Sequence, residues 1–255
     1  MLTSTVEDYL KTILNMEDMQ ERASTSRVAR RLAVADASVT DMMRKLQKAG
    51  LLEYRPYYGV TLTEKGRQSA LKVLRRHRLI ELFLHRTLGY GWELVHEEAE
   101  RLEHVVSDLF VERLDALLGF PAKDPHGEVI PDAMGHRQEE HLTCLADARP
   151  GAHTILRVKS RDPGFLTFLE QEGLVPSRCL SLLERIPFQG PLKIRLNGKR
   201  MPQYLGLEAA KCIFVIAADQ GKRELLKEAK NRSGHSTGLK NRQVSKNKPW
   251  GRERS

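Results

Sequence analysis

Residues 24–66 read STSRVARRLAVADASVTDMMRKLQKAGLLEYRPYYGVTLTEKG. Two short segments with helical spacing of apolar residues come first, and each is opened by small polar residues. Two alternating segments follow on either side of a basic, aromatic tip at 55–59, and Thr63 then provides an N-terminal cap for another helix. This order of elements predicts a winged helix-turn-helix domain.

Residues 4–20 also have helical spacing and form the first predicted helix, so the segment 37–50 is the third. A domain of this kind places its third helix in the major groove of DNA and its wing along the backbone. Residues 22–75 carry 12 basic and 4 acidic side chains, which favours a polyanionic partner. The bland alternative is a small helical unit that serves only packing or dimerisation. We expect DNA contacts from the small polar start of the third helix, from its basic side chains and from the wing tip, namely Ser38, Thr40, Asp41, Arg44, Lys45, Lys48 and Arg55.

The chain has 255 residues with 42 Lys and Arg against 33 Asp and Glu, a net charge of +9, and its length suggests about two domains. Residues 76–150 have the opposite net charge, with 8 basic and 15 acidic side chains, although chance segregation on solvated faces would give the same pattern.

No run of about 18 apolar residues and no signal peptide is present, and the three cysteines lack CxxC spacing. We therefore expect a soluble, cytoplasmic protein without membrane association, disulfide framework or zinc finger.

Beyond the first domain the residue pattern changes twice, first to long amphipathic helices and then to short strands. Long amphipathic helices are predicted over 64–88 and 92–119, followed by a Pro- and Gly-rich loop and a polar linker over 136–149. Five short strands and one small helix after His153 predict a small SH3-like β-barrel. The fold class is mostly α with a small β domain. The predicted units are a DNA-binding domain (1–75), a helical dimerisation and metal-binding domain with linker (76–149), an SH3-like domain (150–220) and a basic, disordered tail (221–255).

The stretch HEEAERLEH at 96–104 carries the chemistry. On one helix, His96, Glu100, Glu103 and His104 would share a face, and His77 and Glu81 repeat the i, i+4 spacing on the preceding helix. Imidazoles and carboxylates converging between two helices are typical of divalent metal sites in helical bundles, whereas a solvated face is the alternative. The HExxH zinc motif fails because its second histidine is replaced by Glu100, and no nucleophile triad, phosphate loop or dinucleotide fingerprint appears, so we expect no catalysis.

Six segments in this order resemble the diphtheria toxin repressor family of metal-dependent transcriptional repressors, over about residues 4–220. Within that family the chain is most similar to manganese transport regulators that carry a third, SH3-like (FeoA-like) domain. The segments are EDYLKTI (7–13), SVTDMMRKLQKAGLL (38–52), LTEKG (62–66), HRLIELFL (77–84), HEEAERLEHVVSD (96–108) and DPHGEVIP (124–131).

The resemblance implies two metal sites between the first helix and the two long helices, with one or two ions per subunit. The primary site would comprise Asp8, Glu100, Glu103 and His104. The second would use His77 and Glu81, with His96 as a further candidate and Asp124, His126 and Asp162 supplied by the loop and the small barrel. Metal binding would allow a homodimer to bind a pseudo-palindromic operator in double-stranded DNA.

The donor types bear on the identity of the metal. According to the resemblance, iron-responsive members have Met and Cys where this chain has Asp8 and Glu100, and an all-carboxylate and imidazole set suits Mn(II) better than softer donors would. Lys11 stands where short two-domain manganese regulators have a Glu ligand, and Asp124 where some three-domain relatives have Cys. The prediction is a manganese-responsive repressor that controls metal-uptake genes. The alternatives are an Fe(II)-dependent repressor of the same family and a metal-independent DNA-binding module.

Overall fold

A computed structural model describes residues 2–55, 59–138, 140–223 and 226 of the chain. The predicted wing tip at 56–58 and nearly all of the predicted basic tail at 221–255 lie outside the described residues, as does the side chain of Arg55. Among the described residues, none of the helices has the length and apolar character that crossing a membrane would require.

The N-terminal part of the chain forms the predicted winged helix-turn-helix. Its elements are α1 (Ser4–Asp18), α2 (Thr25–Leu32), α3 (Asp36–Lys48), β1 (Leu52–Arg55), β2 (Gly59–Leu62) and α4 (Glu64–Leu88). β1 and β2 pair antiparallel, and the Thr63 hydroxyl accepts a hydrogen bond from the Gly66 amide (3.0 Å) at the start of α4. A β-carbon at Gly66 would lie 2.0 Å from the Leu51 carbonyl oxygen, so only glycine lets α4 approach the start of the wing this closely.

The prediction of one helix over 92–119 is wrong, because the structure has two helices in this region. α5 (Trp92–Leu102) and α6 (Asp108–Leu118) are separate helices. The Ser107 hydroxyl accepts a hydrogen bond from the Phe110 amide (3.2 Å) and begins α6, while Glu103 is the C-terminal cap of α5. Glu103 and His104 therefore lie in the break between two helices rather than on one continuous helical face.

The C-terminal part of the chain is an antiparallel sheet in the order β3-β8-β4-β5-β6-β7, with bulges in the β4–β8 and β5–β6 pairings. The elements are β3 (Thr143–Cys144), β4 (Gly151–Val158), α7 (Pro163–Glu172), β5 (Cys179–Arg185), β6 (Leu192–Leu196), β7 (Gln203–Leu205), α8 (Leu207–Lys211) and β8 (Ile213–Ala217). The domain has the strand-rich SH3-like character that was predicted. It is not the closed barrel that was predicted, because among the described strands the edge strands β3 and β7 do not pair with each other.

The structure adds two elements to the five strands and one helix predicted for this region. β3 contains two residues and α8 contains five, which is too short for a periodic pattern to reveal. β3 lies inside the range 136–149 that the sequence assigns to a linker, and it pairs with β8. The sheet therefore begins before the Pro150–Gly151 turn.

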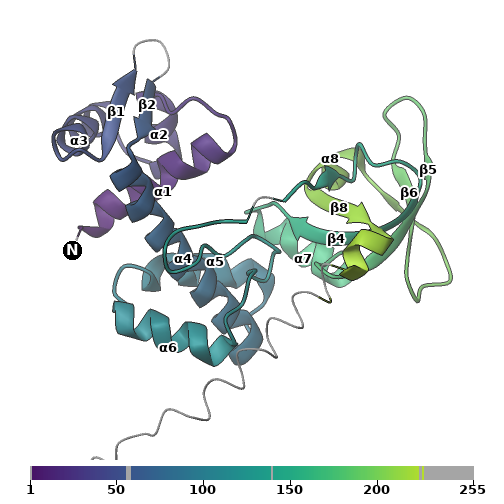
Figure 1. The fold of residues 1–255 in the computed structure, drawn as a ribbon. Helices are drawn as coiled ribbons and strands as arrows, with labels where there is room; N and C mark the ends of the chain where they lie inside the picture. The colour runs from purple at the N-terminus through teal and green to yellow at the C-terminus, as the bar shows by residue number, and fades with distance from the viewer. Residues whose placement is uncertain (1, 56–58, 139, 224–225, 227–255) are drawn as a thin grey trace, which may run out of the picture.

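Three hydrophobic cores follow one another along the molecule. Ala70, Leu71 and Leu74 from the first half of α4 pack into the winged helix, whereas Leu79, Ile80 and Leu84 from the second half pack with α5 and α6. Figure 1 shows α4 extending from the winged helix toward α5 and α6. The six-stranded sheet lies to the right of these helices in the figure, beyond α7. α4 is thus a single rigid link between the first two cores, and α5 contacts α7 of the third.

Candidate metal centres and DNA interface

Asp8, Glu103 and His104 form the first group of metal-type donors, called here the Asp8 cluster. One potential ligand atom from each lies within 4.8 Å of the others. His104 Nε2 is 2.9 Å from Asp8 Oδ1 and 3.3 Å from Glu103 Oε1. Because Asp8 belongs to α1 and the other two residues belong to the break after α5, this cluster joins the winged helix to the helical region.

Glu7 completes the surroundings of His104, a role that the sequence pattern did not predict. His104 Nδ1 donates to Glu7 Oε2 (2.7 Å), which leaves Nε2 as the nitrogen that faces the carboxylates of the cluster. Arg76 on α4 contacts the other oxygen of Glu7 at 3.2 Å. A carboxylate that holds the far nitrogen of an imidazole is the usual support for a metal-binding histidine. A helical spacing pattern within α1 offers no sign of this contact, because its partner is 97 residues away.

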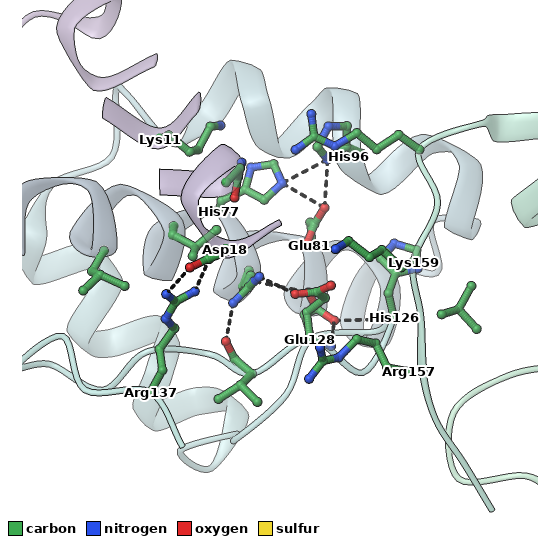
Figure 2. A pocket seen from close by; sticks show the side chains of 18 of the residues that line it. Lys11, Asp18, His77, Glu81, His96, His126, Glu128, Arg137, Arg157 and Lys159 are labelled. Atoms are coloured by element: carbon green, nitrogen blue, oxygen red, sulfur yellow. Dashed lines mark hydrogen bonds and ion pairs between the residues drawn. The ribbon is translucent and has the colours of Figure 1, made fainter. Parts of the chain in front are cut away.

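His77, His96 and Glu100 form the second group, called here the His96 cluster, and their potential ligand atoms also lie within 4.8 Å of one another. His77 Nε2 is 3.0 Å from His96 Nδ1 and 2.9 Å from Glu81 Oε1, and Glu81 is also 3.2 Å from His96 Nδ1. Figure 2 shows the side chains of His77, Glu81 and His96 pointing toward one another. α4 supplies His77 and Glu81, and α5 supplies the others.

The structure differs from the predicted primary set in the place of Glu100. Its Oε1 atom is 3.6 Å from His96 Nε2, one turn earlier on α5, so it groups with His77 and His96 rather than with Asp8. The physical reason is the break after Leu102. Glu100 stays on the face of α5, whereas Glu103 and His104 leave the helix and turn toward α1.

Lys11 lies between the two clusters. Its Nζ atom donates to Glu100 Oε1 at 2.9 Å and also to Glu103 Oε1, and only 5% of the residue is exposed. A buried ammonium between two carboxylates neutralises part of their charge. The Lys11 ammonium therefore lies between the two clusters. The resemblance to short two-domain manganese regulators implies a glutamate carboxylate at this position.

Asp124 and His126 line the same cavity of about 820 Å³ as His77, Glu81, His96 and Glu100. Both are buried, and Asp124 Oδ1 accepts hydrogen bonds from the amides of His126 and Glu128 at 2.9 Å each. His126 Nδ1 is buried without a hydrogen-bond partner among the described residues. The loop after α6 thus adds a carboxylate and an imidazole to the wall that faces the His96 cluster.

Asp162 occupies a different position from the one predicted. It is exposed, and its carboxylate accepts a hydrogen bond from the Phe165 amide (2.7 Å) as the N-terminal cap of α7. The neighbouring Arg161, and not Asp162, is among the described residues that line the cavity. The structure therefore does not bring Asp162 together with the other nine candidate ligands.

The buried charges are unevenly balanced. Burial alone would lower the pKa of His77, but the Glu81 carboxylate and hydrogen bonds to Glu103 and Glu81 raise it to about 9. Burial would raise the pKa of Glu81, yet the charge and hydrogen bond of His77 hold it well below its usual range. Burial and the nearby Glu81 charge raise the pKa of Asp124 well above its usual value. The surrounding carboxylates thus favour the protonated form of His77, whereas burial disfavours the ionised form of Asp124. A cation bound beside Asp124 would stabilise its carboxylate.

The residues present fit a divalent metal ion. Every donor of the two clusters is a carboxylate or an imidazole, which are ligands of Mn(II), Fe(II) and similar ions. The orphaned His126 Nδ1 and the raised pKa of Asp124 are what a site built around a positive charge would produce.

The predicted DNA-binding residues lie on α3, apart from Arg55. Ser38, Asp41, Arg44, Lys45 and Lys48 are exposed. Thr40 is half-buried, and its hydroxyl donates to the Asp36 carbonyl oxygen (2.9 Å). Arg44 is 3.7 Å from Asp41, but both side chains are more than 70% exposed, so this weak pair leaves Arg44 free to turn toward a phosphate. A row of exposed basic side chains on the second helix of a helix-turn-helix suits the major groove.

A winged helix joined through a donor cluster to a helical metal-type site defines a metal-responsive DNA-binding protein. Comparisons with known families agree with this class. Residues 1–60 match the family described as "Iron dependent repressor, N-terminal DNA binding domain", residues 63–132 match "Iron dependent repressor, metal binding and dimerisation domain", and residues 143–217 match "FeoA domain".

Individual relatives point the same way. The iron-dependent repressor IdeR of Mycobacterium tuberculosis (strain H37Rv) is 38% identical over 189 residues, which cover 69% of this chain and 82% of IdeR. The regulator MntR of Bacillus pumilus is 33% identical over 140 residues, 55% of this chain and 96% of MntR. A solved structure described as a manganese-dependent transcriptional repressor in complex with manganese shares 38% identity and a TM-score of 0.76, over 83% of this chain and 99% of the other. The chain belongs to the diphtheria toxin repressor family of metal-dependent DNA-binding transcriptional repressors.

Proposed function

We propose that this protein is a manganese-responsive repressor whose two metal centres use the Asp8 and His96 clusters. In this proposal it acts in the cytoplasm as a homodimer on a pseudo-palindromic operator, and it controls genes for metal uptake. The observation that carries the proposal is the origin of the Asp8 cluster, because its donors come from α1 of the winged helix and from the break after α5.

The residues of this cluster couple metal to DNA through the position of α1. Asp8 has its pKa raised, chiefly by burial, and Glu103 is fully buried beside it. A divalent ion bound there would offset the repulsion of these carboxylates. Asp8, Glu103 and His104 would then hold α1 against the helical region, and with it the orientation of α3. If metal favours this arrangement and DNA requires it, each ligand tightens binding of the other by the same factor.

The homodimer is supported by an apolar surface on α6 and the segment before it. Val105 is 77% exposed, Leu109 60% and Leu117 69%. Several exposed large apolar side chains within one short segment are typical of an interaction surface. Two winged helices related by a twofold axis would read two half-sites, which explains the expectation of a pseudo-palindromic operator.

Manganese is favoured by donor chemistry, and iron is the second candidate. The donors of both clusters are oxygen and imidazole nitrogen, with no thiolate or thioether among them, which suits a hard ion. The similarity to IdeR, named as iron-dependent, supports Fe(II) as the alternative. In vitro affinity for Co²⁺, Ni²⁺ or Zn²⁺ does not decide between the two candidates, since these ions bind most nitrogen and oxygen sites more tightly.

The test is DNA binding by metal-stripped full-length protein at fixed salt, titrated separately with Mn²⁺ and with anaerobic Fe²⁺. The probes are genomic fragments enriched with the Mn²⁺-loaded protein. We expect binding to appear at a lower free concentration of Mn²⁺ than of Fe²⁺. The reverse order supports the iron-dependent alternative, and equal binding in chelator and in either metal would show a constitutive DNA-binding module. Fixed salt is essential because phosphate contacts dominate affinity.

A further inference from the structure

His126 is held by its surroundings in an unusual way. Only 8% of the residue is exposed, and its Nδ1 atom has no hydrogen-bond partner among the described residues. Its ring meets the ring of Trp92 edge to face, with centroids 4.9 Å apart and planes at 68°. A buried imidazole nitrogen without a partner is costly, so such a residue stays in place only where its neighbours hold it or a ligand uses it.

The backbone of the His126 loop is fastened to the sheet domain. The amide of Val158 at the end of β4 donates to the His126 carbonyl oxygen (2.8 Å). Gly127 has φ +84°, and a β-carbon there would lie 1.9 Å from the Leu156 carbonyl oxygen on the same strand. Glycine is therefore required at this position both by the backbone conformation and by the closeness of β4.

Trp92 connects the same loop to the His96 cluster. It is the first residue of α5, is 3% exposed, and packs within the hydrophobic core of the sheet domain. His96 follows one turn later on α5, so the two side chains leave the same face of the helix. Trp92 thus contacts His126 directly and fixes the start of the helix that carries His96 and Glu100.

We propose that Trp92 and Gly127 are positioning residues that hold His126 against the His96 cluster, so that packing of the sheet domain on α5 sets the metal affinity of this second centre. The inference rests on the proposed function, which identifies the ligand as a divalent metal ion. It assigns the FeoA-like domain a role through β4 and Trp92 that does not require Asp162 to bind metal.

The experiment compares Mn²⁺ binding to metal-stripped full-length variants by isothermal titration calorimetry. His126→Ala defines the class of sites that depends on this loop, and Asp8→Ala defines the class at the Asp8 cluster. Trp92→Leu and Gly127→Ala are each expected to weaken the His126-dependent class about tenfold or more, the usual cost of losing a group that supports a ligand, and to leave the other class unchanged. Trp92→Phe keeps an aromatic edge against His126 and is expected to restore most of the affinity. Phe168→Leu, an exposed aromatic on α7, is the matched control and should change nothing.

A fluorescence readout separates positioning from a general loss of structure. The chain has two tryptophans, Trp92 and Trp250, so Trp250→Phe leaves Trp92 as the only reporter. Mn²⁺ should change its emission, and His126→Ala should abolish that change.

Unchanged Mn²⁺ affinity in a folded Trp92→Leu or Gly127→Ala protein would overturn the inference, as would an equal loss of both classes. In those cases wild-type binding remains, and the proposed function stands. If the wild-type protein binds no Mn²⁺ in either class, the proposed function and this inference fail together.

Discussion

The Asp8 cluster and the His96 cluster use the same kinds of donor but are built differently. The donors of the Asp8 cluster come from two parts of the molecule with separate cores, and one of them, Asp8, is about one-third exposed. The donors of the His96 cluster lie on two helices that share one core. His77, one of its two histidines, is buried and hydrogen-bonded to Glu103. The first arrangement suits a switch that changes with domain orientation, whereas the second suits a site that stabilises one region. Four predictions test this difference.

The largest effect is expected from Asp8→Ala. Removing the only donor that α1 contributes to the Asp8 cluster should leave the protein folded but abolish the metal-dependent gain in DNA affinity, which for couplings of this kind is about 5- to 150-fold. Fluorescence anisotropy with operator DNA in chelator and in Mn²⁺ measures the gain. Asp41→Ala on the exposed face of α3 is a useful contrast, because it should alter affinity equally with and without metal. A full metal-dependent gain in Asp8→Ala would contradict the assignment of this cluster as the switch.

Lys11→Met tests whether the ammonium between the clusters is structural. Loss of one partner of a buried ion pair usually costs about 3–5 kcal/mol, so chemical denaturation in chelator should show a destabilisation of that order. The penalty should shrink in Mn²⁺, because metal would neutralise the carboxylates that Lys11 leaves behind. The exposed Lys72→Met on α4 serves as control. An equal destabilisation with and without Mn²⁺ would mean that Lys11 does not share its carboxylates with a metal centre.

The pH dependence of the metal-stripped protein follows from His77. Its pKa in the folded protein is about 9, above the usual value of 6.5 expected in the unfolded chain. The stabilisation from protonated His77 is therefore fully present below pH 6.5 and is lost as pH rises through 9, by an amount on the order of 3 kcal/mol. Denaturation midpoints in chelator at pH 6.5 and pH 9 measure this loss.

His77→Gln should flatten that profile, which isolates His77 from Asp124 and the other buried groups. Metal must displace the same proton, so Mn²⁺ affinity at the His96 cluster should rise by up to about tenfold per pH unit over this range. A profile that keeps its slope in His77→Gln would remove His77 as the cause.

The smallest effect is expected from Ser107→Ala. Its hydroxyl caps α6 and so helps to keep the break that turns Glu103 and His104 toward α1. Loss of an N-terminal cap costs about 1 kcal/mol, which thermal denaturation would detect, and Mn²⁺ affinity of the Asp8 cluster should fall with it. Ser69→Ala within α4, whose hydroxyl bonds only to its own helix, is the matched control. Full stability in Ser107→Ala would show that other contacts maintain the break.

The winged helix was predictable because its signals are local. α4 begins at Glu64 and ends at Leu88 as expected, since Thr63 caps one end and Gly89 ends the other. The i, i+4 spacing likewise placed His77 near Glu81, and His96 near Glu100. Short strands such as β3 and the unpaired edges of the sheet left no such pattern.

The order and type of the elements, the exposed basic face of α3 and the presence of carboxylates and imidazoles on α4 and α5 were determined by the sequence itself, through capping, periodicity and residue chemistry. The division of the donors into two clusters was decided only by tertiary structure. It depends on the break after Leu102, on Lys11 crossing to Glu100, and on Glu7 reaching His104 across 97 residues. These contacts join parts of the chain that are far apart in sequence. Each charge that the fold buries needs a partner, and local periodicity does not record which distant residue will supply it.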